Sequence, residues 1–132
     1  MAGTLVADTI QNGAGTSTSM TNAITGSAKA WVVWYNASST TVVINGSYNV
    51  SSVTANSAGD FTVNMTNAMP NANYVVCGSG GTSTTGQACF TTPAVASGGY
   101  PNTTTAFRAQ LLAANGVLVT TLGYAQCAVF SS

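Results

Sequence analysis

The segment that decides the fold is residues 47–76, which reads SYNVSSVTANSAGDFTVNMTNAMPNANYVV. Its apolar residues alternate with polar ones, first through residues 48–53 and then, after a break, as Phe61, Val63 and Met65. Successive side chains of a strand point to opposite faces, so this spacing predicts strands with one face in a core and the other in water. The break contains Asn and Gly, which tolerate the positive φ of a tight reversal. We therefore predict an antiparallel β-hairpin here.

Strands are predicted on both sides of this hairpin. Before it lie residues 28–35, where the continuous apolar run VVWY (32–35) predicts burial on both faces, within a sandwich core or between subunits. Residues 41–44 follow, and Asn45-Gly46 predicts a two-residue hairpin that joins them to the next strand. After the hairpin, strands are predicted at residues 87–92, 105–112, 117–122 and 124–130, with a hairpin signal at Asn115-Gly116.

The spacing of these segments predicts the fold class. Residues 78–86 are rich in glycine, so we expect no strand there, and no helical period follows that would make them a phosphate-binding loop. About eight short strands without a helix are typical of an antiparallel β-sandwich or a jelly roll. We predict an all-β domain over residues 27–132.

Residues 1–26 differ from the rest because their apolar residues are sparse. Such a segment cannot form a core, so it is either a loose terminus or an extended N-terminal arm that docks on a neighbouring subunit. The candidate residues for a subunit or virion interface come from this arm and from the apolar run: Leu5, Val6, Ile10, Met20, Val33, Trp34 and Tyr35.

Charged side chains are scarce, and this bounds the chemistry. Of 132 residues only 3% are charged, where soluble domains have roughly 25%. The four charges are Asp8, Lys29, Asp60 and Arg108, and there is no histidine. General acid–base catalysis needs histidine or paired carboxylates, and the two aspartates lie in the arm and in a predicted turn. We therefore expect no enzyme. A formal net charge of zero favours association, so we expect a partner in a larger assembly.

The same composition argues against several partners. Two cations make no basic patch for nucleic acid, and the chain lacks the ligand clusters of a metal site or a cofactor. No apolar run reaches membrane-spanning length, and the first residues do not resemble a secretory leader, so we expect no membrane partner. The three cysteines, Cys77, Cys89 and Cys127, lie in apolar stretches, and we expect small buried side chains rather than a disulfide.

Several blocks resemble a module of tailed-bacteriophage virion proteins that occurs at tail-fibre ends and as small stand-alone structural proteins. They are SAKAWV (27–32), SYNVSSVT (47–54) and GDFTVNMTNAMPNANY (59–74), and GTLVADTIQNGAGTS (3–17) is similar to segments that precede the module. The likeness covers residues 3–76 closely and then mainly Phe107-Arg108 and the last strand. It departs at Val33-Trp34-Tyr35, where the family more often has Asn and Phe followed by Asn-Gly.

The resemblance implies a trimeric β-structure on the virion exterior, assembled in the bacterial host cytoplasm. Two roles stay open. A capsid decoration (cement) protein fits the small size, the absence of a preceding shaft and the arm, and it binds itself and other virion proteins. A tail-fibre tip or host-receptor-binding module fits the resemblance to fibre ends and the Gly-, Ser-, Asn- and Tyr-rich loops, and its partner is a host surface glycan.

Overall fold

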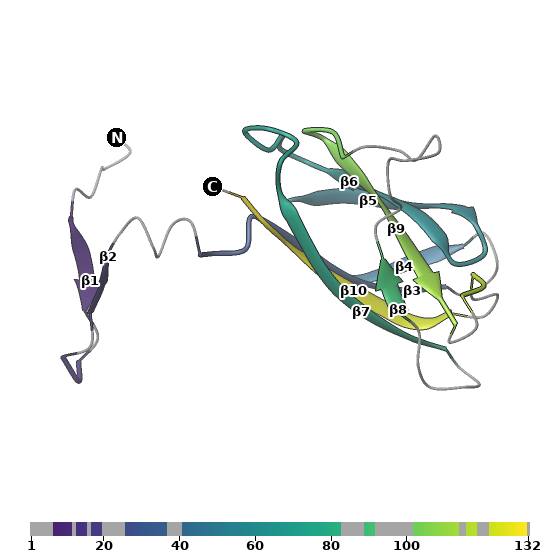
Figure 1. Ribbon diagram of the computed structural model, residues 1–132, viewed down its shortest axis with the longest axis horizontal. Coiled ribbons are helices and arrows are strands. Elements are labelled where there is room, and N and C mark those ends of the chain that lie inside the picture. Colours follow the sequence, from purple (N-terminus) through teal and green to yellow (C-terminus); the bar gives the residue numbers. More distant parts are fainter. Residues whose placement is uncertain are drawn as a thin grey trace.

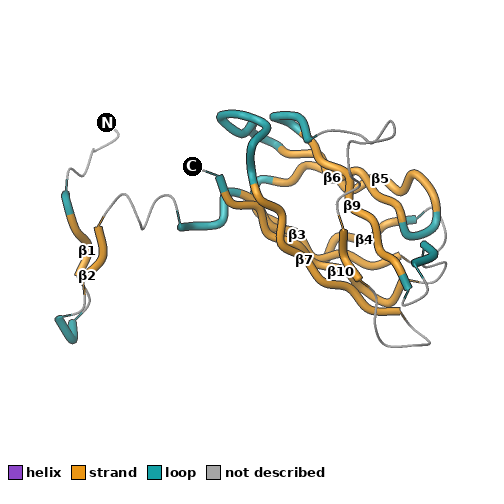
Figure 2. Tube along the Cα trace, viewed as in Figure 1, coloured by secondary structure: helices purple, strands orange, loops and turns teal. Residues whose placement is uncertain are grey.

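The computed structural model describes residues 7–11, 13–15, 17–19, 26–36, 41–82, 89–91, 102–113, 116–118 and 122–131. Within these residues there is no helix, and two four-stranded antiparallel sheets face each other as a sandwich (Figures 1 and 2). A third, two-stranded sheet lies near the N-terminus. The predicted all-β sandwich is confirmed.

Strands distant in sequence meet in each sheet. The first sheet has the order β4-β3-β10-β7, with bounds β3 Ala30–Asn36, β4 Val42–Tyr48, β7 Val75–Thr82 and β10 Leu122–Phe130. The second has the order β5-β6-β9-β8, with bounds β5 Val50–Ser57, β6 Asp60–Met65, β8 Cys89–Thr91 and β9 Ala106–Leu112. The small sheet pairs β1 (Thr9–Gln11) with β2 (Ser17–Ser19).

The predicted hairpin is confirmed as β5–β6. Val53 lies opposite Val63 in an antiparallel register, and Gly59 at the turn has a φ of 73°. Phe61, Val63 and Met65 all point into the core and are buried, as their alternation predicts.

The core lies between the two sheets and is built on aromatic contacts. The rings of Trp34 and Phe61, one from each sheet, meet edge to face with centroids 5.7 Å apart. The hydroxyl of Tyr74 donates to the carbonyl of Thr103 or Ala106, at 2.8 and 3.0 Å, which satisfies it although the side chain is buried. Burial raises the pKa of Tyr74 to about 12, so this hydroxyl stays protonated and donating.

Strand β3 corrects one prediction. Within this chain the run VVWY is not buried on both faces, because Ala30, Val32 and Trp34 point into the core while Trp31 is exposed on the other side; burial of that side between subunits stays a prediction. Val33 and Tyr35 are half-buried. Aromatic and branched residues suit a strand whether or not both faces are covered, so a continuous apolar run does not by itself show two-sided burial.

The predicted turn at Asn45-Gly46 is wrong. Strand β4 runs through both residues, and the chain reverses instead at Asn49, whose φ is 54°. The Asn49 side-chain oxygen accepts hydrogen bonds from the backbone and side-chain nitrogens of Asn67, at 2.7 and 3.1 Å, and its amide nitrogen donates to the Lys29 carbonyl at 3.1 Å. Asn tolerates the left-handed conformation, and here it carries the chain from the first sheet to the second.

The glycine-rich stretch that we expected to be a loop contains more than half of β7, from Gly78 to Thr82. A Cβ added at Gly78 would lie 2.7 Å from the Phe90 ring, and one at Gly80 would lie 2.0 Å from Leu111. Side chains of the opposite sheet therefore occupy the places where side chains of β7 would stand. The glycines are required by close packing, a known reason for glycine inside a strand.

The C-terminal predictions are confirmed in part. Strand β9 matches residues 105–112 closely, and in β10 Ala125, Cys127 and Val129 form the buried face. Of the predicted strand at residues 117–122, Leu118 makes an isolated bridge to Leu112 and β10 begins at Leu122, while residues 119–121 lie outside the described residues. Gly116 turns the chain with a φ of 77°, whereas Asn115 lies outside the described residues.

Candidate functional site

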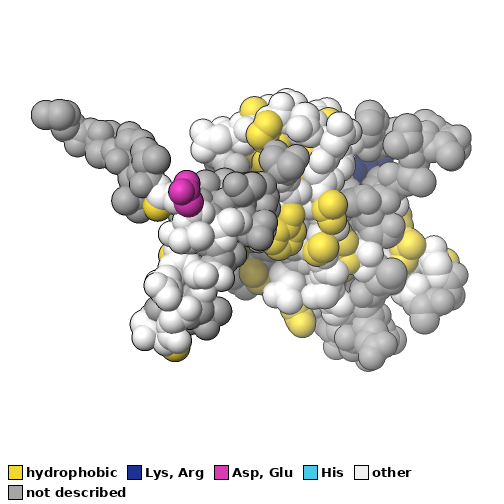
Figure 3. Space-filling model, turned by 60° about the vertical axis from the view of Figure 1, so that its left-hand side comes forward, with side chains coloured by type: hydrophobic (Ala, Val, Ile, Leu, Met, Phe, Trp, Pro, Cys, Tyr) yellow, Lys and Arg dark blue, Asp and Glu magenta, His cyan; other side chains and the backbone are white. Residues whose placement is uncertain are grey.

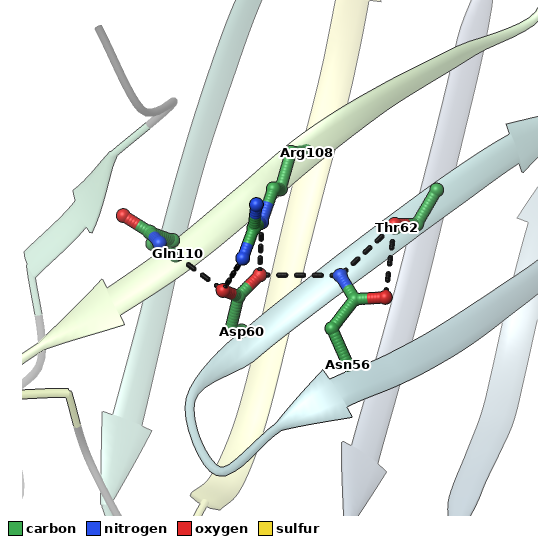
Figure 4. A network of polar contacts seen from close by, with 5 residues as sticks. All are labelled: Asn56, Asp60, Thr62, Arg108 and Gln110. Atoms are coloured by element: carbon green, nitrogen blue, oxygen red, sulfur yellow. Dashed lines mark hydrogen bonds and ion pairs between the residues drawn. The ribbon is translucent and has the colours of Figure 1, made fainter. Parts of the chain in front are cut away.

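The outer face of the β5-β6-β9-β8 sheet carries a closed polar network around Asp60 (Figure 4). Arg108 binds both carboxylate oxygens, with its Nε 2.6 Å from Oδ1 and its Nη2 bonded to Oδ2. The amides of Asn56 and Gln110 each donate to the same carboxylate at 3.2 Å. Asn56 also bonds Thr62 at 2.9 Å, so five side chains from three strands are tied together.

This network defines the chemistry of Asp60, which is only 2% exposed. Burial alone would raise its pKa, but the hydrogen bonds from Arg108, Asn56 and Gln110 and the charge of Arg108 outweigh burial and lower the pKa below its usual 3.8. An ionised carboxylate that already accepts from three side chains is poorly placed to exchange protons with a substrate. Asp60 therefore acts as a structural anchor.

The outer face of the β4-β3-β10-β7 sheet is open and apolar by contrast. Trp31 is 40% exposed, Tyr48 58%, Tyr124 51% and Val75 61%. The register sets Trp31 opposite Tyr48 on one side and Ala128 on the other, so these side chains share the outer surface. Figure 3 shows apolar side chains exposed among uncharged polar ones on the side that it presents. We call this outer surface of β4, β3, β10 and β7 the open face.

A hollow of about 470 Å³ lies in the open face across β3, β10 and β7. Three small side chains, Ala128, Cys77 and Ser79, lie on its floor, with Ala128 opposite Cys77 and Gln126 opposite Ser79. The Gln126 amide donates to the Ser79 hydroxyl at 3.1 Å. The described side chains around the hollow are Trp31, Val33, Cys77, Ser79, Gln126 and Ala128.

The structure describes four of the seven predicted interface residues. Trp34 is fully buried in the chain's own core, so its assignment to an interface is wrong; its position alternates with Trp31, which is the exposed tryptophan. Val33 and Tyr35 lie half-buried on the open face. Ile10 lies in β1 and is 49% exposed. Leu5, Val6 and Met20 lie outside the described residues.

Sequence reasoning missed Trp31, Tyr48, Ser79 and Gln126. The signal for Trp31 was present, since it stands one position from the core residues Ala30 and Val32. Ser79 was hidden inside a glycine-rich stretch that did not resemble a strand.

The cysteines divide between the two sides of the sheet. Cys127 is buried, as expected, and burial raises the pKa of its thiol to about 12. Cys77 is exposed, which corrects the prediction that it is buried: it points outward from β7 at the rim of the open face. Both are free thiols, and the Cys89 side chain lies outside the described part of the chain.

The described residues include no group of three or more His, Cys, Asp or Glu side chains suited to a metal ion. They also include no helix with the length and hydropathy needed to span a membrane. Known protein families, curated proteins and solved structures give no match to this chain.

Proposed function

We propose that the chain is a non-enzymatic structural protein of the exterior of a tailed-phage virion, where it acts as a homotrimeric capsid decoration (cement) protein. The resemblance of residues 3–76 to virion modules supports the setting. The hydrogen bonds that Arg108 and Gln110 donate to Asp60 support a structural rather than a catalytic role for that carboxylate. The decoration role rests on the N-terminal hairpin.

That hairpin is the observation that carries the proposal. Strands β1 and β2 pair only with each other among the strands that the structure describes, and each has three residues. A two-stranded sheet of this size is marginal in water by itself. Ile10 is exposed on it. Docking on a neighbouring subunit or on the capsid shell would bury Ile10 and supply further backbone hydrogen bonds.

The test is to delete residues 2–20. Among the described residues, the buried core contains none from this segment, so the sandwich should keep nearly the same melting temperature. Binding to undecorated particles should fall at least tenfold, measured by co-sedimentation. Within the full chain, Ile10→Ala should weaken attachment and Thr9→Ala, its neighbour in β1, should not. Attachment unchanged by the deletion would refute docking through the arm, and unfolding would show that the arm belongs to the core.

We also expect the isolated protein to be a trimer. The chain has zero formal net charge, and exposed apolar residues on a domain of this size favour association. Light scattering at micromolar concentration should give three times the chain mass of 13.2 kDa. A monomer mass together with a folded β-sheet circular dichroism spectrum would refute this prediction.

The hollow in the open face favours a second candidate role, a tail-fibre tip or receptor-binding module. Concave surfaces with apolar walls and a few polar groups are the usual form of small-ligand sites. Imaging of labelled protein on whole virions separates the two roles, because a decoration protein covers the head and a fibre tip labels the distal tail.

A further inference from the structure

We propose that the hollow in the open face is a binding site for an uncharged saccharide, with Trp31 as the stacking platform and Gln126 and Ser79 as the hydrogen-bonding groups. The inference deepens the receptor-binding role and rests on that second candidate. It is carried by the shape of the hollow, the support of the Trp31 ring, the polar pair on the floor and the absence of charge among the described lining residues.

The size of the hollow suits one or two sugar rings. Its volume of about 470 Å³ lies within the roughly 300–1,000 Å³ typical of small-molecule sites. Small residues on the floor leave room above the sheet, and the Trp31 side chain lines the hollow beside them. A flat, half-exposed aromatic ring beside a shallow floor matches the flat C–H face of a pyranose, which packs well against π-systems.

The Trp31 ring is braced from the neighbouring strand. A Cβ built at Gly46 would lie 3.4 Å from Cζ3 of Trp31, so the ring already lies close to the β4 backbone. A ring held in this way loses little conformational freedom when a ligand binds, and that favours affinity.

Gln126 and Ser79 hold each other in position and keep further hydrogen-bonding capacity. The Gln126 amide donates one N–H to the Ser79 hydroxyl at 3.1 Å. A glutamine amide offers two N–H groups and an oxygen, and a serine hydroxyl offers one donor and two lone pairs. The pair can therefore donate to and accept from vicinal hydroxyls, which are both donors and acceptors. A purely apolar ligand would bury these groups without partners, which costs free energy.

The charge of the ligand follows from the lining. None of the described residues around the hollow is Asp, Glu, Lys or Arg. A sialic acid or a phosphorylated sugar would lose hydration there without gaining a counter-charge. The site therefore fits neutral hexose or N-acetylhexosamine units better than acidic ones.

The experiment uses the full-length protein on an array of neutral oligosaccharides built from glucose, galactose, mannose and N-acetylglucosamine, with sialylated versions beside them. At least one neutral set should bind, and its sialylated version should bind more weakly. In titration with the best soluble trisaccharide, Trp31→Ala should raise Kd at least tenfold and Gln126→Leu several-fold. Tyr124→Ala is the matched control, because Tyr124 is an exposed aromatic of β10 that does not line the hollow, and it should leave Kd unchanged.

Three results would overturn the inference. One is no binding of any neutral oligosaccharide at millimolar concentration. Another is an equal loss in the Trp31→Ala and Tyr124→Ala variants, which would place the sugar elsewhere. The third is conversion of the trimer to monomer by Trp31→Ala, which would make the open face a contact between copies. If Trp31→Ala is unstable, Trp31→Phe takes its place, because phenylalanine keeps an aromatic ring. Melting temperature and light scattering serve as controls for both variants. Attachment to particles through the arm is measured in a separate experiment. A negative result with saccharides therefore does not refute the proposed decoration role.

Discussion

Gly80→Ala should lower the free energy of unfolding of the sandwich by about 3 kcal/mol and its melting temperature by roughly 10 °C. A Cβ at this position would lie 2.0 Å from Cδ2 of Leu111 and 3.2 Å from the carbonyl oxygen of Tyr124. Leu111 is fully buried, so its side chain has nowhere to move without displacing other core residues. Urea denaturation followed by tryptophan fluorescence measures the loss.

Gly46→Ala is the matched control, since Gly46 is also a strand-interior glycine of the same sheet and its Cβ would meet only an ordinary contact at 3.4 Å. It should change stability by less than about 0.5 kcal/mol. The double variant Gly80→Ala with Leu111→Ala should be more stable than the two separate losses predict, because the second change removes the atom that clashes. Strict additivity would show that the clash is not the cause.

Asp60→Asn should cost about 2–3 kcal/mol, because it leaves Arg108 without its charge partner while Gln110 and Asn56 still point at the site. The wild-type protein should also lose this stability in acid. The folded-state pKa of Asp60 lies below its unfolded value, so the contribution is complete above about pH 5 and disappears as pH falls through the lowered pKa. Melting curves between pH 2 and 7 measure it.

The loss of stability in acid can be assigned to one residue, because the chain has only two acidic side chains. Asp60→Asn should give a nearly flat stability profile below pH 5, whereas Asp8→Asn, the control at the exposed second aspartate, should keep the wild-type slope. An acid-sensitive profile that survives Asp60→Asn would assign the effect to another group.

The strands that could be predicted from the sequence are those with a local alternation of apolar and polar residues. Strands β6, β9 and β10 have one face in the core and one outside, and their burial alternates along the strand. Asn45-Gly46 failed as a turn signal because β4 continues through both residues, with Gly46 paired opposite Val33 and Asn45 at a register shift. The reversal lies instead at Asn49, which side-chain hydrogen bonds stabilise. Local turn preference is weaker than these longer-range contacts.

What depends on contacts between the sheets could not be predicted in the same way. The need for glycine in β7 comes from Phe90 and Leu111, which are distant in sequence. The hollow likewise arises where β3, β10 and β7 meet, and no single segment shows it. Asp60 and Arg108 were recognisable as rare charges, but their pairing follows from the register of β6 against β9.

The pairing of β3 with β10 also determines when the protein can fold. Ala30 lies opposite Val129, so the centre of the first sheet joins the beginning of the domain to its last strand. Such distant pairing slows folding, because a long loop must close before the contacts form. During synthesis the β5–β6 hairpin can form early, whereas β3 lacks its partner β10 until residues 122–130 have left the ribosome. We expect the first sheet to form only after β10 has been made, and deletion of β10 to leave that sheet without its centre.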